Sequence, residues 1–155
     1  KYKFITSIAR CFTFVGPILP LDIHYAVGNF LKKKSSNKNI ILNSSGNSVR
    51  SFMYMTDLTV WLFFILFKGK NKSIYNVGSD SGISIKNLAK LVNKLEKNKS
   101  KIIFKKNVKN ENKTFYVPCI NKAKQDLGLN IKHNLNISLK KTYSNIIKNK
   151  NYYNI

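Results

Sequence analysis

A run of ten residues, Leu58 to Phe67, contains nine apolar side chains and a single threonine. As an α-helix it would be about 15 Å long, half of the roughly 30 Å that the hydrocarbon core of a membrane requires. The run therefore predicts a buried helix over residues 57–67, with Thr56 as its N-cap and Asp57 in its first turn. Because the helix is apolar on nearly every side, we expect other elements to cover most of its faces.

Strand-like and helix-like segments alternate along the rest of the chain, which predicts the α/β fold class. The expected strands lie near residues 4–11, 40–42, 49–55, 74–77 and 101–104. The other expected helices lie near residues 24–34, after Ser84, at 121–127 and at 137–149. Ser84 is a good N-cap, and Gly128 is placed to end the helix before it. A polar loop is expected at 105–114, and no interdomain linker divides the 155 residues.

The net charge of +22 is carried almost entirely by lysine, because Arg10 and Arg50 are the only arginines among 28 basic residues. Sequence-specific nucleic-acid recognition relies on the bidentate arginine fork, so this charge does not indicate a typical nucleic-acid binder. Lysine, asparagine and isoleucine fill 65 of 155 positions and share A/T-rich codons, which indicates a coding bias. The alternative is a basic module that binds nucleic acid or an anionic surface through a lysine face formed by Lys86, Lys90, Lys94 and Lys97.

Complete catalytic signatures are missing from the sequence. The two cysteines and two histidines form neither a zinc pattern nor a disulfide framework. The seven glycines form no dinucleotide fingerprint or phosphate-binding loop, and no tyrosine has a lysine four residues further on. We therefore assign no catalytic residue and no metal ligand in this chain.

Three segments nevertheless carry a recognisable pattern: ARCFTFVGP at 9–17, GNSVRSFMYMTDL at 46–58, and IYNVGS at 74–79 followed by ISI at 83–85. In this order and spacing they resemble the C-terminal half of the extended short-chain dehydrogenases/reductases, the NAD-dependent epimerases and dehydratases that act on nucleotide sugars. Tyr116-Val117-Pro118 and Leu127-Gly128 fall where this family has its last loop and helix. The resemblance covers nearly the whole chain.

The resemblance implies a Rossmann-like protein with a small substrate-binding lobe, of which this chain lacks the N-terminal dinucleotide-binding portion. Residues 1–22 would be the last portion of the sheet region, and residues 23–155 mainly the substrate-binding lobe with interleaved sheet elements. The family's glycine fingerprint and its Tyr-x-x-x-Lys pair would lie upstream. The implied cofactor is NAD or NADP, but its phosphate-binding loop is absent from this sequence.

The resemblance also assigns substrate-binding residues. Arg50 stands where relatives grip the diphosphate, and a chain with two arginines would place one there because lysine replaces a bidentate fork poorly. Asn29 and Phe30 match a helix start that contacts the substrate phosphate in relatives. A plain surface arginine and a plain polar residue at a helix start are the alternatives.

Four further positions match less closely. Thr13 stands where relatives often have asparagine, so its hydroxyl would make that hydrogen bond. Relatives often have arginine and aspartate around the Tyr-Val-Pro segment, where this chain has Phe115 and Cys119; Lys113 would then replace the missing cation. Gly16 and Pro17 match the turn beside the nicotinamide, with a simple turn as the alternative.

These residues predict the nucleotide-sugar-binding portion of an epimerase or dehydratase in nucleotide-sugar and surface polysaccharide metabolism, with a UDP-, dTDP- or CDP-sugar as partner. The chain would be a fragment of a longer enzyme or a truncated relative that is inactive on its own. We expect a cytoplasmic protein without a membrane span. Because the strand near residue 4 would belong to a parallel sheet with upstream strands, we also expect it to need its N-terminal half or a partner chain.

Overall fold

The computed structural model describes residues 4–21, 25–97, 100–105, 113–153 and 155, and it confirms the α/β class. The helices are α1 (Ala26–Ser35), α2 (Met55–Lys68), α3 (Ile85–Asn93), α4 (Asn121–Leu127) and α5 (Leu135–Lys148). The strands are β1 (Ser7–Cys11), β2 (Phe14–Val15), β3 (Ile40–Leu42), β4 (Val49–Ser51), β5 (Met53–Tyr54), β6 (Ser73–Val77), β7 (Gly82–Ser84), β8 (Ile102–Phe104) and β9 (Phe115–Tyr116). Residues 106–112 of the expected polar loop lie outside the described residues.

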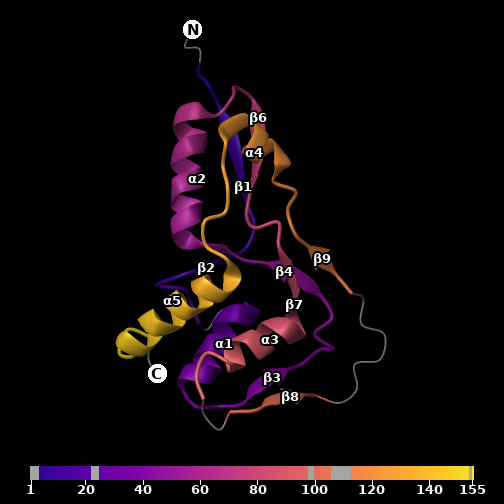
Figure 1. The fold of residues 1–155 in the computed structure, drawn as a ribbon, viewed down its shortest axis with the longest axis vertical. Helices are drawn as coiled ribbons and strands as arrows, with labels where there is room; N and C mark the ends of the chain where they lie inside the picture. The colour runs from indigo at the N-terminus through magenta and orange to yellow at the C-terminus, as the bar shows by residue number, and fades with distance from the viewer. Residues whose placement is uncertain (1–3, 22–24, 98–99, 106–112, 154) are drawn as a thin grey trace.

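The first structural unit is a parallel pair of strands, β1 and β6, in which Ser7 to Cys11 run beside Ser73 to Val77. Helix α2 lies along this pair, and α4 lies beside β6 (Figure 1). Their apolar side chains form one cluster with the inward residues of β6. The members of this cluster include Trp61, Ile65, Tyr75, Val77, Ala123 and Leu127.

The second structural unit gathers the short strands around α1 and α3. β4 pairs antiparallel with β7 and parallel with β9, while β3 and β8 form a separate parallel pair. α1 and α3 pack together between these strands, and α5 contacts α1 (Figure 1). The buried side chains shared by these helices include Val27, Leu31, Leu88, Val92, Leu139 and Ile146.

Several local predictions are confirmed. β3 has the predicted bounds, and the Ser84 hydroxyl accepts a hydrogen bond from the Asn87 N–H at 3.3 Å as the N-cap of α3. Gly128 ends α4 with a φ of 64°, a left-handed conformation that glycine adopts without a steric penalty. The segment predicted as one strand at 49–55 is two strands, β4 and β5, which lie in different sheets.

The long apolar helix differs from the prediction in two ways. α2 begins at Met55 with Tyr54 at its N-cap, so Thr56 lies within the helix and does not cap it. The expectation that most of its faces are covered is wrong for the residues that the structure describes, because only Asp57, Trp61 and Ile65 are buried in α2. None of the described helices is both long enough and apolar enough to cross a membrane.

Candidate functional site

A cavity of about 410 Å³ lies where β1, β4, β9 and the start of α1 approach one another. We call it the Arg50 cavity. Its lining includes Phe12, Thr13, Tyr25, Ala26, Arg50 and Tyr116. The rings of Phe12 and Tyr116 are stacked with their centroids 4.7 Å apart, and the Arg50 guanidinium carbon lies 6.0 Å from the centre of the Tyr116 ring. One cation and two stacked aromatic rings therefore form part of its wall.

The Arg50 guanidinium is held by neutral oxygen atoms. Its Nη1 donates to the backbone oxygen of Val49 at 2.8 Å, and its Nη2 donates to the Oγ1 of Thr114 at 2.9 Å. The Thr114 hydroxyl in turn donates to Ser48 Oγ at 3.1 Å. β4 carries Arg50 and Thr114 directly precedes β9, so the pairing of these two strands places the two residues side by side.

No described carboxylate neutralises this arginine. The acidic side chains that the structure describes contact other groups: Asp57 contacts His133, Asp80 contacts Lys124, Asp126 contacts Lys70, and Glu96 accepts a hydrogen bond from the Tyr143 hydroxyl. In the part of the chain described, the Arg50 charge therefore remains available to an anion in its cavity.

The N-terminus of α1 is a second feature of the Arg50 cavity that attracts an anion. Tyr25 is its N-cap and Ala26 its first residue, and both line the Arg50 cavity. No described side chain caps this helix, and its first turn contains no acidic residue. The N-terminus of a helix carries a partial positive charge and unpaired N–H groups, so it attracts the same ligands as Arg50.

A second cavity, of about 490 Å³, adjoins the first, because Ala26 and Ile85 line both. We call it the Asn29 cavity. It lies between α1 and the ends of the parallel strands β3 and β8. Its lining includes Asn29, Phe30, Lys33, Asn43, Ser44 and Lys105. Amide, hydroxyl and ammonium groups thus lie around an apolar floor, and this combination suits a planar polar ligand.

The structure brings most of the predicted substrate residues together. Thr13 and Arg50 line the Arg50 cavity, and Asn29 and Phe30 line the Asn29 cavity. Lys113 is exposed and is not among the lining residues of either cavity.

The predicted cofactor residues lie elsewhere. Pro17 lines a different hollow beside α5, and Gly16 packs against Met55, whose Cγ would be only 2.5 Å from a Cβ at position 16. Close packing against α2 therefore explains why residue 16 is a glycine.

Sequence reasoning missed Asn43, Ser44 and Lys105. Asn43 and Ser44 directly follow β3, and Lys105 directly follows β8. The Lys105 N–H donates to the Leu42 backbone oxygen at 3.0 Å, which continues the pairing. Ligands of α/β proteins often bind at the carboxyl ends of parallel strands. The polar residues that directly follow two predicted strands could therefore have indicated these positions.

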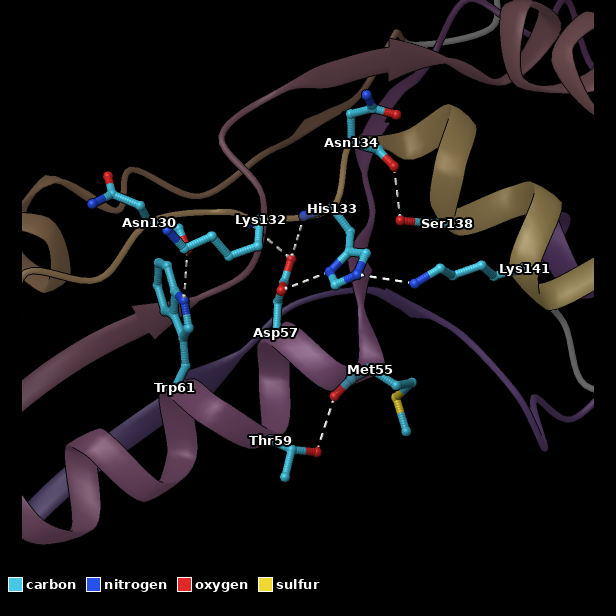
Figure 2. Close-up of polar contacts among 10 residues, drawn as sticks. All are labelled: Met55, Asp57, Thr59, Trp61, Asn130, Lys132, His133, Asn134, Ser138 and Lys141. Carbon is cyan, nitrogen blue, oxygen red and sulfur yellow. Dashed lines mark hydrogen bonds and ion pairs between the residues drawn. The ribbon is translucent and has the colours of Figure 1, made fainter.

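A separate polar cluster surrounds the buried carboxylate of Asp57 (Figure 2). One carboxylate oxygen lies 2.9 Å from His133 Nδ1, and the other accepts the N–H groups of Lys132 and His133 at 3.2 and 2.9 Å. Four residues along α2, the Trp61 ring nitrogen donates to the Asn130 backbone oxygen at 3.5 Å. These hydrogen bonds hold residues 130–133 against α2, so Asp57 and His133 have a structural role.

Within the described ranges, no group of three or more histidine, cysteine, aspartate or glutamate side chains could hold a metal ion. The glycine-rich loop that would bind the pyrophosphate of a dinucleotide is absent from this sequence.

Comparison with known proteins gives a consistent result. Residues 1–78 match the NAD dependent epimerase/dehydratase family. The human dTDP-D-glucose 4,6-dehydratase is 32% identical over 91 residues, which are 58% of this chain and 25% of that protein. UDP-glucuronic acid decarboxylase 4 of Arabidopsis thaliana is 29% identical over 121 residues, which are 78% of this chain and 27% of that protein. The chain thus spans about a quarter of these relatives.

A solved structure shares the fold. The UDP-glucose 4-epimerase of Thermotoga maritima, determined with UDP-glucose, superimposes with a TM-score of 0.82 at 21% identity. The superposition covers 92% of this chain and 46% of that one. The fold described above therefore corresponds to slightly less than half of that epimerase.

Proposed function

The chain belongs to the NAD-dependent epimerase/dehydratase family of extended short-chain dehydrogenases/reductases, and we propose that it forms the nucleotide-sugar-binding portion of such an enzyme. Under this proposal it corresponds to the C-terminal half. Residues 1–22 then belong to the last portion of the sheet region, and residues 23–155 mainly form the substrate lobe with interleaved sheet elements such as β6. The ligand is a nucleoside diphosphate sugar with a uracil, thymine or cytosine base.

The observation that carries this proposal is the guanidinium of Arg50, which no described carboxylate neutralises, in a cavity that the start of α1 also lines. A diphosphate carries two negative charges and several acceptor oxygens, which match a guanidinium and a helix N-terminus. The Thr13 hydroxyl lies in the same cavity and can donate to a sugar oxygen. Diphosphate and sugar are therefore placed in the Arg50 cavity.

The base is placed in the adjoining Asn29 cavity. Pyrimidines present a donor and acceptor pattern along one edge, and Asn29, Asn43 and Ser44 offer both kinds of group. The wall shared by the two cavities, at Ala26 and Ile85, lets one ligand extend through both. The base and the diphosphate of one nucleotide would thus occupy two neighbouring cavities.

This chain would bind and orient the substrate, whereas the proton and hydride transfers would use groups outside it. NAD, when bound, supplies the hydride chemistry of the family. The upstream tyrosine and lysine implied by the resemblance would supply the acid and base. Under this proposal, the chain acts together with a dinucleotide-binding portion that supplies these groups.

The test is a calorimetric titration, with UDP and with UDP-glucose, of the 155-residue chain expressed together with the family's dinucleotide-binding half. Arg50→Ala should weaken the affinity for both about 10- to 100-fold, because a charge-assisted contact to phosphate is lost. Arg10→Ala is the matched control, since Arg10 is the other arginine and lies on β1. Equal affinities of the wild-type chain and the Arg50→Ala variant would refute the proposed diphosphate site.

A titration with RNA tests the alternative of a basic module. Binding that falls steeply with salt and does not compete with UDP would favour that alternative. If the proposal is right, RNA binds weakly and without saturation. UDP binding should then be much less sensitive to salt than any RNA binding.

A further inference from the structure

The turn that follows β2 contains a residue in a backbone conformation that its side chain disfavours. Ile18 has a φ of 63°, in the left-handed region, although isoleucine is β-branched and such residues rarely adopt a positive φ. Its side chain is 65% exposed, so tight packing does not hold it there. Strained backbone of this kind persists where the surrounding structure fixes it, and it is concentrated at functional sites.

A hydrogen bond from the C-terminal segment fixes this turn. The Ile18 N–H donates to the Tyr153 hydroxyl oxygen at 2.8 Å, and that hydroxyl donates to Asn145 Oδ1 at 3.0 Å. The Tyr153 ring is only 7% exposed and belongs to the buried cluster around α1, α3 and α5. α5 also lies beside β2, which precedes the turn (Figure 1). Because its ring and its hydroxyl are both held in place, Tyr153 is a rigid anchor for the Ile18 backbone.

The other end of the turn is fixed by α1. The Pro20 backbone oxygen would lie only 2.7 Å from a Cβ at position 28, so the close approach leaves no room for a side chain on Gly28. Leu19 packs against the same buried cluster that contains Tyr153. The position of Leu19 and Pro20 therefore depends on α1 on one side and on the hydrogen bond between Ile18 and Tyr153 on the other.

Leu19 and Pro20 form part of the wall of a third cavity. This cavity has a volume of about 160 Å³, and we call it the Leu19 cavity. Three of its lining residues, Phe12, Thr13 and Tyr25, also line the Arg50 cavity, whereas none of them lines the Asn29 cavity. The three cavities therefore follow one another in the order Asn29, Arg50, Leu19. The full lining of the Leu19 cavity is Phe12, Thr13, Phe14, Leu19, Pro20 and Tyr25.

We propose that Tyr153 is a positioning residue for the sugar-binding end of the site. By holding Ile18 in its left-handed conformation, the hydroxyl keeps Leu19 and Pro20 in place as the wall of the Leu19 cavity. The order of the cavities matches the order of base, diphosphate and sugar in a nucleoside diphosphate sugar, so the sugar extends from beside Arg50 toward this wall. This inference rests on the proposed function, which supplies the ligand.

The lining of the Leu19 cavity suits a sugar ring. Three of its residues are aromatic and supply apolar surface for the C–H face of a pyranose, and the Thr13 hydroxyl can donate to one of the sugar oxygen atoms. A displaced turn would withdraw its part of this wall without moving Arg50. Loss of the Tyr153 hydroxyl should therefore weaken binding of the sugar and spare binding of the nucleotide.

The experiment is a pair of calorimetric titrations, with UDP-glucose and with UDP, of the 155-residue chain expressed together with the family's dinucleotide-binding half. The test variant is Tyr153→Phe, which keeps the buried ring and removes only the hydroxyl. Tyr152→Phe is the matched control, because Tyr152 is the neighbouring tyrosine and is 65% exposed. Tyr153→Phe/Ile18→Asn is the rescue variant, since asparagine adopts the left-handed conformation more readily than isoleucine.

Tyr153→Phe should lower the affinity for UDP-glucose about five- to tenfold, as expected for one hydrogen bond, and the affinity for UDP less than about twofold. The amide of Ile18 should also exchange faster with deuterium in this variant, as measured by NMR. The Tyr152→Phe control should bind both ligands like wild type. The rescue variant should recover most of the affinity for UDP-glucose, because residue 18 then keeps its conformation without the tyrosine hydroxyl.

Three results would overturn the positioning role and leave the proposed diphosphate site intact. They are an unchanged affinity of Tyr153→Phe for UDP-glucose, equal losses for UDP-glucose and UDP, and a rescue variant that binds UDP-glucose no better than Tyr153→Phe. An unchanged exchange rate of the Ile18 amide would also overturn it. If the wild-type protein binds neither ligand, the proposed function is refuted, and this inference with it.

Discussion

The Nη2 of Arg50 donates a hydrogen bond of 2.9 Å to the Oγ1 of Thr114, a residue 64 positions further along the chain. The Thr114 hydroxyl in turn donates a hydrogen bond to Ser48 Oγ at 3.1 Å. Both partners are neutral, so they fix the direction of the guanidinium without neutralising it. Thr114 is thus a positioning residue for the proposed diphosphate contact.

Thr114→Val should lower the affinity for UDP about three- to tenfold in calorimetry. Valine has nearly the same shape as threonine but lacks the hydroxyl that accepts from Arg50. The loss of this hydrogen bond, worth about 0.5–1.5 kcal/mol, leaves the guanidinium less firmly oriented. Thr114→Ser keeps the hydroxyl and should retain most of the affinity. If the serine and valine variants bind UDP equally, Thr114 does not position Arg50.

Asn43→Leu should separate base recognition from phosphate recognition. Asn43 is exposed and lines the Asn29 cavity, which Arg50 does not line. Replacing its amide should weaken UDP binding about tenfold, because the polar edge of the base loses a hydrogen-bond partner. Binding of inorganic pyrophosphate should stay unchanged. The measurement is a pair of calorimetric titrations, one with UDP and one with pyrophosphate. Parallel losses for both ligands would place the base elsewhere.

Features set by a few neighbouring residues could be read from the sequence. Ser84 caps α3, and Gly128 ends α4, because each acts on backbone groups within a few positions. The contacts that build the candidate site join distant residues instead. Lys105 reaches the end of β3 through the pairing of β8 with β3, and Arg50 meets Thr114 through the pairing of β4 with β9. Such pairings depend on the whole fold.

The α2 helix shows a different limit of sequence reasoning. Its apolar run predicted a helix correctly and implied that most of its faces need cover, but composition does not say which structure supplies the cover. Within the described chain, Trp61 and Ile65 pack in a cluster with β6 and α4, and Asp57 contacts residues 132–133. The side chains on the other faces of α2, such as Phe63 and Phe67, are exposed.

Asp57→Asn should lower the free energy of unfolding by about 1–3 kcal/mol. The buried carboxylate accepts two backbone N–H groups and contacts His133 Nδ1, and an amide cannot accept all of these bonds with both of its polar atoms (Figure 2). Denaturant unfolding followed by circular dichroism measures the change. Asp80→Asn is the control, because its pair with Lys124 lies at the surface and should contribute little. A loss no larger than that of the control would contradict this role.

Removing the ion pair between Lys70 and Asp126 should change how stability depends on pH. The hydrogen bond from the Lys70 ammonium, at 2.6 Å, lowers the pKa of Asp126, and the Tyr75 hydroxyl donates to the same carboxylate at 3.3 Å. A carboxyl whose pKa is lower in the folded state stabilises the fold above its unfolded pKa. This contribution is lost as the pH falls through the lowered, folded pKa.

The Asp126→Asn variant should therefore be less stable than wild type near pH 7, and the difference should shrink as the pH falls through the acidic range. Lys70 is largely exposed, so the difference should also shrink in high salt. Thermal unfolding of both proteins from pH 7 to about pH 2 measures it, since the ordinary aspartate pKa is about 3.9. Lys70→Met should reproduce most of the effect, because the hydrogen bond from Lys70 is the main cause of the lowered Asp126 pKa. A stability difference that stays constant over this range would show that the ion pair does not contribute to folding.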